Sequence, residues 1–169
     1  GIDIKGKKIT VAGGGGAATA IQVQCALDGA REISIFNIKD AFFERTLQTA
    51  EKIRKAVPGC VVNVYDIADT AKMTEEIQSS DIFANATIVG MKPMDDQSVV
   101  KDLSAFRPGL VVADAVYNPI ETKLLREAKE AGCTCVGGKG MLLWQGVAAF
   151  KLFTGKDMPV QEVKELFFQ

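Results

Sequence analysis

Four consecutive glycines near the start of the sequence follow a short apolar stretch and have the spacing of a phosphate-binding turn. The apolar residues Ile9 to Ala12 are typical of a strand, and a helix is predicted to open after the glycines, at Ala17. Counted from Gly13, the pattern is G-x-G-x-x-A, which puts small residues where a tight turn, a close diphosphate and close helix packing need them. The helix N-terminus would add unpaired backbone N–H groups and the positive end of its dipole. The pattern therefore predicts a dinucleotide site built mainly from backbone atoms.

One side chain that often transfers protons and holds metals is missing from this sequence. It contains no histidine, so the commonest general base and metal ligand is missing. Proton transfer would fall to lysine, aspartate or tyrosine, or to residues outside this chain. The cysteines lack C-x-x-C spacing and are interpreted as reduced structural thiols; they are Cys25, Cys60, Cys133 and Cys135. We predict no metal site.

Length and composition fit one globular domain, or one with a small appendage. The 169 residues are 47% hydrophobic, which is enough for a proper core. There are 20 basic and 21 acidic residues, a net charge of -1, so nothing in the charge favours nucleic acid or an anionic membrane surface as a partner. No apolar run approaches the roughly 18 residues of a membrane span, and no leader opens the chain. We expect a soluble, cytoplasmic protein.

Apolar strand patterns alternate with helical patterns along the whole chain. Strands are predicted over 8–12, 32–36, 61–65, 82–85, 110–113 and 134–136. Helices are predicted over 17–27, 41–56, 70–79, 121–131 and 141–153, and 160–168 has apolar residues at helical spacing, which we interpret as a packing face. The alternation predicts an α/β fold, a Rossmann-type doubly wound parallel sheet of six strands with helices on both faces, in the order 3-2-1-4-5-6.

Ligands of such sheets bind outside the carboxyl ends of the strands. Small or polar residues follow five of the predicted strands, over 13–16, 37–40, 85–91, 114–119 and 137–141. Turn chemistry alone explains many of these residues. Five such loops on one rim nevertheless favour a binding site.

The motifs in these loops resemble, in order, those of the C-terminal cofactor-binding domain of shikimate dehydrogenases, and are most similar to the quinate/shikimate dehydrogenase branch. They are Val11-Ala-Gly-Gly-Gly-Gly-Ala-Ala18, Asn85-Ala-Thr-Ile-Val-Gly-Met91, Asp114 with Tyr117-Asn-Pro119, and Gly138-Lys-Gly-Met-Leu-Leu-Trp-Gln-Gly146, then Phe150 and Thr154-Gly155. The set covers almost the whole chain, so the resemblance implies an NAD(P)-binding Rossmann domain over 1–169. It also implies NAD(P)-dependent interconversion of a ring hydroxyl and ketone, as between shikimate or quinate and the 3-dehydro ketone, in aromatic amino acid biosynthesis.

The resemblance also implies roles for individual residues. The pyrophosphate would lie at Gly13, Gly14, Gly15, Gly16, Ala17 and Ala18, and the adenosine ribose at Asn37, Lys39 and Asp40. The cofactor would extend toward its nicotinamide along Asn85, Ala86, Thr87, Ala115, Val116, Gly138 and Met141. Tyr117 and Gln145 would face the substrate. The alternatives are a loop-anchoring hydroxyl for Tyr117 and an ordinary helix-surface amide for Gln145, while core packing would suit Trp144 as well as a place beside the nicotinamide.

Residues after the second predicted strand bear on the choice of cofactor. NADP-preferring members of the family have Asn-Arg-Thr there, and the arginine grips the 2′-phosphate. Ile38 takes the arginine's position in this chain, and Asp40 offers a carboxylate to a ribose hydroxyl about 20 residues beyond the glycines. We therefore expect NAD to be preferred, with Lys39 still allowing some binding of NADP. Alternatively, Asp40 only caps the following helix.

The family's catalytic lysine and aspartate belong to an N-terminal substrate domain that has no counterpart in this sequence. We therefore predict no catalytic residue in this chain, cofactor binding without turnover, and some apolar surface uncovered where the missing domain would pack. A homodimer stays open. Two alternatives also remain, a non-catalytic NAD-binding regulatory module and an S-adenosylmethionine-dependent methyltransferase.

Overall fold

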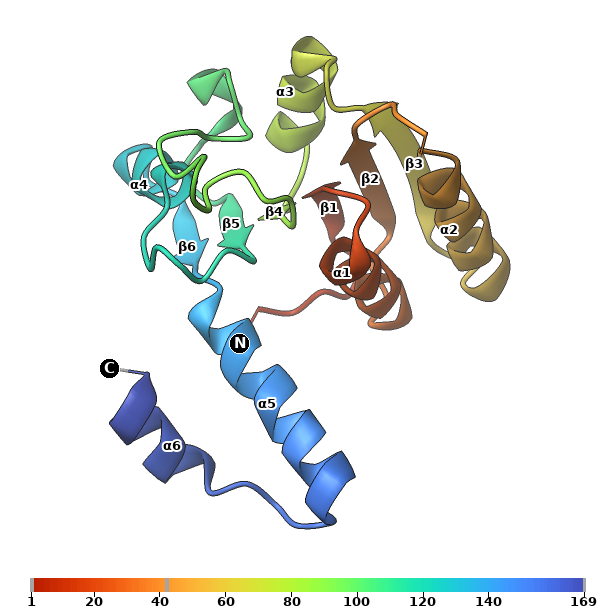
Figure 1. Ribbon diagram of the computed structural model, residues 1–169. Helices are drawn as coiled ribbons and strands as arrows, with labels where there is room; N and C mark the ends of the chain where they lie inside the picture. The colour runs from red at the N-terminus through yellow and green to blue at the C-terminus, as the bar shows by residue number, and fades with distance from the viewer. Residues whose placement is uncertain (1, 42, 169) are drawn as a thin grey trace.

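The computed structural model describes residues 2–41 and 43–168 and contains one six-stranded parallel sheet (Figure 1). The strands are β1 (Lys8–Ala12), β2 (Glu32–Asn37), β3 (Val61–Asp66), β4 (Ile82–Asn85), β5 (Val111–Asp114) and β6 (Thr134–Val136). Their order is β3-β2-β1-β4-β5-β6, and every neighbouring pair is parallel. The predicted fold class and strand order are therefore confirmed.

The first four helices cover the two faces of this sheet, and two more follow at the C-terminal end. They are α1 (Gly16–Leu27), α2 (Phe43–Ala56), α3 (Thr70–Gln78), α4 (Lys123–Glu130), α5 (Lys139–Thr154) and α6 (Val160–Phe167), with a short 3-10 helix over Leu103–Ala105 that the sequence analysis did not predict. On one face, residues of α1 and α2 such as Ala18 and Ile53 pack on Ile33 and Ile35. On the other, residues of α3 and α4 such as Ile77 and Leu124 pack on Phe83. Every residue of β1 is buried, as expected for a strand covered on both sides.

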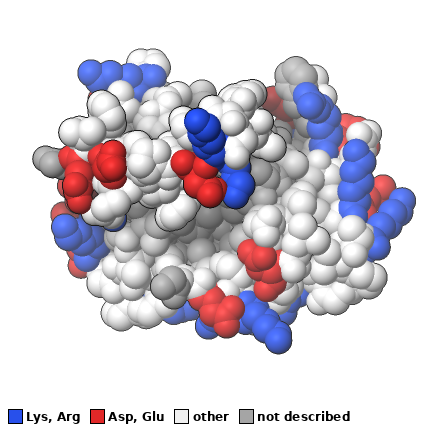
Figure 2. Space-filling view, turned by 90° about the horizontal axis from the view of Figure 1, so that it is seen from below, with Lys and Arg blue, Asp and Glu red and all other residues white. Residues whose placement is uncertain are grey.

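The C-terminal helices α5 and α6 extend away from the sheet (Figure 1). Leu143 is the buried residue of α5, and α6 buries none of its described residues. Leu166 and Phe167 are 73% and 74% exposed, so the packing face predicted over 160–168 has no partner within the described part of the chain. The face from which these helices project is mostly uncharged and hollowed near its centre (Figure 2). Within the described residues, no helix combines the length and apolar character needed to cross a membrane.

Candidate dinucleotide-binding site

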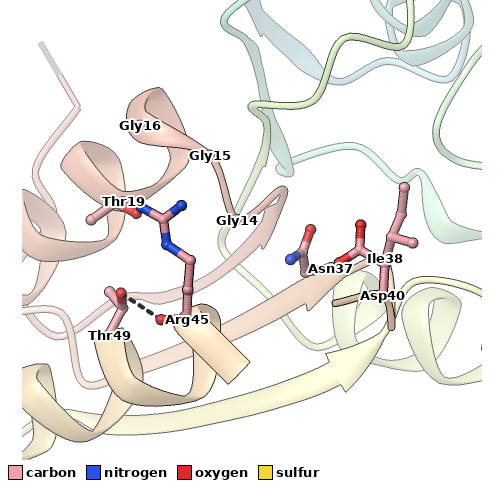
Figure 3. Close-up of a pocket in the computed structure, with 9 residues that line it drawn as sticks. All are labelled: Gly14, Gly15, Gly16, Thr19, Asn37, Ile38, Asp40, Arg45 and Thr49. Carbon is pink, nitrogen blue, oxygen red and sulfur yellow. Dashed lines mark hydrogen bonds between the residues drawn. The ribbon is translucent and has the colours of Figure 1, made fainter. Parts of the chain in front are cut away.

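Three cavities open at the carboxyl ends of the strands. The first, of about 570 Å³, lies between the glycine loop, the end of β2 and α2 (Figure 3). The second, of about 530 Å³, shares Gly14, Gly15, Asn37 and Ile38 with the first and extends to the loop after β4. The third, of about 370 Å³, lies where β4 and β5 end beside the start of α5. The glycine loop therefore separates two cavities and borders on both.

The four glycines divide into two pairs with different constraints. Gly13 has a φ of +121°, and a Cβ there would lie 2.7 Å from the carbonyl oxygen of Ala86. A Cβ on Gly14 would collide with the side chains of Asn37 and Thr46. At Gly15 and Gly16 an added Cβ would meet nothing within 4 Å. Packing within the protein therefore requires the first two glycines, whereas the second two leave open space beside the backbone where a ligand can approach.

The start of α1 offers its positive end to that open space. Gly15 is the N-cap and has no side chain to cap the first N–H groups, and the first turn holds no acidic residue. The N-terminal N–H groups of a helix lack partners within the helix itself. This terminus therefore has the character of an anion-binding site.

Gln22 supports the loop from beneath, and the sequence analysis missed it. The side chain is 1% exposed, and its Nε2 donates to the carbonyl oxygen of Gly13 at 3.1 Å. The N–H of Gly13 donates to the carbonyl of Phe36 at 2.7 Å, so both sides of this residue are held. A glutamine on the inner face of an alanine-rich helix was the available signal, because a buried amide needs a partner.

The first cavity brings residues from the end of β2 and from α2 against the glycine loop, which is distant from them in sequence. Asn37 donates through Nδ2 to Thr46 Oγ1 at 2.9 Å, which fixes its side chain against Gly14. Arg45, which the sequence analysis did not select, extends from α2 toward Thr19 and the glycine loop (Figure 3). Asp40 lines the same cavity across from it, and the carbonyl of Asp40 accepts from the N–H at position 43, where α2 begins.

The third cavity is bounded by the turn after β5 and by the start of α5. A Cβ on Gly138 would lie 2.6 Å from the carbonyl oxygens of both Ala115 and Val116, so only glycine allows this contact. Met141 and Trp144 line the cavity, and Trp144 is 60% exposed. Core packing is therefore the wrong interpretation of Trp144.

Most predicted cofactor residues meet at these cavities, but some do not. Those that line them are Gly13, Gly14, Gly15, Gly16, Asn37, Asp40, Asn85, Ala86, Thr87, Ala115, Gly138 and Met141. Those that do not are Ala17 and Lys39, which are exposed, and Ala18 and Val116, which are buried. The predicted substrate residues Tyr117 and Gln145 are exposed and lie outside the three cavities.

Asp114 is the buried ionisable group of this region, at 3% exposure. Burial raises the pKa of its carboxyl group, and hydrogen bonds from Thr122, Val116 and Asn85 act in the opposite direction. Within the described residues, no group of three or more His, Cys, Asp or Glu side chains is placed to hold a metal ion. All four cysteines are free thiols.

The order of the parallel strands, the helices on both faces and the glycine turn at the first crossover define a Rossmann-type nucleotide-binding domain. The family model described as the shikimate 5'-dehydrogenase C-terminal domain matches residues 138–166. The chain is 48% identical over 166 residues to quinate/shikimate dehydrogenase from Escherichia coli O139:H28, covering 98% of this chain and 57% of that protein. Nearly the whole chain is therefore similar to part of a quinate/shikimate dehydrogenase, and residues 138–166 match the C-terminal domain of shikimate 5'-dehydrogenases.

Solved structures show the same similarity. Shikimate 5-dehydrogenase from Listeria monocytogenes, in complex with shikimate and NAD, matches with a TM-score of 0.92 and 49% identity, over 98% of this chain and 57% of that chain. A shikimate dehydrogenase in complex with NADP+ matches with a TM-score of 0.79 and 32% identity, over 95% of this chain and 53% of that chain. The chain thus spans a little over half the length of the relatives it matches.

Proposed function

We propose that this chain is the NAD(P)-binding domain of a shikimate/quinate dehydrogenase, which interconverts a ring hydroxyl and a ketone. The observation that carries the proposal is the glycine loop, which is fixed by packing at Gly13 and Gly14 and open at Gly15 and Gly16, with a cavity on either side. The 48% identity to a quinate/shikimate dehydrogenase over nearly the whole chain supports the same function.

The cavities suggest how the cofactor would lie. Its diphosphate would meet the N–H groups at the start of α1, and its adenosine would enter the first cavity beside Asn37 and Asp40. Its nicotinamide would extend past Thr87 toward Ala115 and Gly138. When bound, the cofactor would supply the donor or acceptor of the hydride. The residues of this chain would hold and orient it and keep water from its inner side.

Two residues of opposite charge in the first cavity would set the choice between NAD and NADP. The carboxylate of Asp40 can accept from a ribose hydroxyl and would repel a 2′-phosphate, whereas the guanidinium of Arg45 would attract one. Because Ile38 cannot contribute a charge, we propose that NAD is preferred and that Arg45, rather than Lys39, keeps NADP binding measurable. Asp40→Asn should then bring the dissociation constants for NAD and NADP closer together. Arg45→Ala should move them further apart.

The groups that move the proton would lie in the part of the relatives that this chain does not span. The exposed apolar residues of α5 and α6 would pack against that part; they are Trp144, Leu152, Phe153, Leu166 and Phe167. The substrate would then sit between the two parts, and Tyr117 and Gln145 would face it. Cytoplasmic localisation and a homodimer stay predictions.

Titration and turnover together test the proposal. The chain should bind NAD in calorimetry but form no NADH with shikimate or quinate, and the longer protein should oxidise at least one of the two acids. Turnover by this chain alone would contradict the assignment of proton transfer to another domain. Binding of S-adenosylmethionine instead of NAD would favour the methyltransferase, and a longer protein that binds NAD but turns over neither acid would favour a regulatory module.

A further inference from the structure

A buried hydrogen-bond network joins the ends of β4 and β5 beside the third cavity. Its members are Asn85, Asp114 and Thr122, which are 1%, 3% and 0% exposed. Asn85 Nδ2 donates to Asp114 Oδ1 at 3.0 Å, and Thr122 Oγ1 donates to Asp114 Oδ2 at 2.6 Å. The three side chains come from two strand ends and from the N-cap of α4.

Asn85 uses its side chain to shape the loop that follows β4. Its Nδ2 also donates to the carbonyl of Val89 at 3.0 Å. Its Oδ1 accepts from the backbone N–H of Thr87 at 3.1 Å and from Thr87 Oγ1 at 2.7 Å. These bonds occupy the donors and acceptors of the amide. The side chain of Asn85, predicted to contact the cofactor, is therefore engaged within the protein.

Asp114 holds the turn that follows β5. Its Oδ1 also accepts from the backbone N–H of Val116 at 3.0 Å. The carbonyls of Ala115 and Val116 in this turn lie so close to Gly138 that a Cβ there would be 2.6 Å from each. The position of the turn thus determines where α5 can begin. One carboxylate connects the loop after β4, the turn after β5 and the start of α5.

Burying a carboxylate is costly, and an apolar cluster would join two strands at lower cost. The three donors to Asp114, which are Asn85, the N–H of Val116 and Thr122, offset part of this cost. Asn85 and the turn that contains Val116 border the third cavity, and Thr122 is the N-cap of α4. A carboxylate acceptor also fixes directions that apolar packing leaves free. The place and the partners of this network are therefore better explained by a need to align the site than by a need for stability alone.

We propose that Asn85, Asp114 and Thr122 are positioning residues for the nicotinamide half of the cofactor. They fix the loops after β4 and β5 relative to each other and to the start of α5, so that Thr87, Ala115 and Gly138 together form one surface for the nicotinamide and its ribose. None of the three side chains has to touch the cofactor. The inference rests on the proposed NAD-binding function and adds the means by which one end of the site is held.

Two substitutions at Thr122 separate the network from simple packing. Thr122→Val keeps the branched shape and a methyl group against Gly90 but removes the hydroxyl, which donates to Asp114 and accepts from the N–H of Leu125 at 3.3 Å. Thr122→Ser keeps the hydroxyl and removes the methyl group. Asp114→Asn is a third variant, which keeps the shape and loses the acceptor for Thr122. Each variant of the 169-residue chain is titrated with NAD and with ADP, which lacks the nicotinamide riboside, well below the melting temperature measured by circular dichroism.

In Thr122→Val and Asp114→Asn, the dissociation constant for NAD should be five to ten times larger than in wild type. The dissociation constant for ADP should stay within twofold of wild type. Thr122→Ser should bind NAD nearly as wild type. Equal weakening of NAD and ADP, no change in either, or an equal effect of Ser and Val would overturn the inference while leaving NAD binding intact. If Thr122→Val fails to fold, the dissociation constants of Asp114→Asn for NAD and ADP test the inference instead. If the wild-type chain binds neither ligand, the proposed function itself is wrong and the inference falls with it.

Discussion

At the amino ends of β1 and β2, charged side chains form a network of ion pairs in which Lys8 and Glu76 are buried. Lys8 Nζ lies 2.8 Å from a carboxylate oxygen of Glu76 and 3.0 Å from one of Glu32, and Lys72 Nζ lies 2.9 Å from the other oxygen of Glu76. Ser34 Oγ donates to Glu76 as well, at 2.7 Å. These contacts satisfy one another and close this end of the sheet.

At the carboxyl ends of the strands, the polar groups hold loops around open cavities. The amide of Gln22, the Asn37–Thr46 pair and the Asn85–Asp114–Thr122 network all support backbone turns. The difference indicates that one end of the sheet contributes mainly stability and the other mainly a binding surface. Substitutions at the two ends should therefore separate stability from cofactor affinity.

The largest effect is expected at Gly13. Gly13→Ala forces a side chain into a positive φ and toward the carbonyl of Ala86, so it should cost about 3 kcal/mol of unfolding free energy and weaken NAD binding by about 100-fold. Gly15→Ala meets no protein atom and should change stability by less than about 0.5 kcal/mol. It should still weaken NAD binding by about tenfold, because the new methyl group would meet the diphosphate. Chemical denaturation and calorimetry measure both quantities, and unchanged NAD affinity in Gly15→Ala would contradict the assigned diphosphate position.

Glu76→Gln should give the opposite result at the other end of the sheet. The substitution removes the shorter of the two carboxylate contacts of buried Lys8 and should lower the unfolding free energy by about 3 kcal/mol, measured by urea denaturation. The matched control is Glu75→Gln, whose exposed pair with Lys72 should contribute less than about 0.5 kcal/mol. Affinity for NAD should stay within twofold in both variants. A large loss of NAD affinity in folded Glu76→Gln would show that the two ends are not independent.

Low pH should lower the unfolding free energy of the chain through the carboxylate of Glu76. Burial acts to raise the pKa of Glu76, but hydrogen bonds from Lys72, Lys8 and Ser34 outweigh it and lower the pKa to about 2. Because the folded pKa lies below the unfolded value of 4.5, this stabilisation is complete above pH 4.5 and is lost as the pH falls toward 2. We expect a loss of about 2 kcal/mol over that range in wild type. In Glu76→Gln, urea denaturation should show a shallower dependence on pH, and equal slopes would refute the role of Glu76.

The smallest effect is expected at Gln22. Gln22→Met keeps the length of the side chain but removes the donor to the Gly13 carbonyl, which should cost about 1 kcal/mol of stability. It should also weaken NAD binding about fivefold, because the diphosphate loop loses a support. Gln24→Met on the same helix removes only an exposed bond to Asp28 and serves as the control. Equal NAD affinity in the two variants would show that Gln22 contributes to stability but not to NAD binding.

Local patterns predicted the fold well because each strand is a short apolar run bounded by turn residues. The bounds of β1, β4 and β6 match the sequence prediction, and the glycine spacing located the first crossover. Contacts between distant segments could not be predicted in this way. Arg45 has the pattern of an ordinary surface residue of a helix until α2 is folded against the glycine loop.

Helical periodicity has a similar limit at the C-terminus. The apolar spacing over 160–168 correctly predicted a helix, α6, but periodicity identifies a face and not its partner. Asn85 shows the same limit for a polar residue, since only the folded structure shows that its amide is used by Thr87, Val89 and Asp114.

An NMR titration of the chain with NAD, following backbone amide shifts, tests the difference between the two ends of the sheet most directly. We predict shifts at Gly14 to Ala17, at Asn37 to Asp40, and at Thr87, Ala115 and Gly138, with the amides of Lys8, Glu32 and Glu76 unchanged. Shifts concentrated around Lys8 and Glu76, or an undisturbed glycine loop at saturating NAD, would contradict the account.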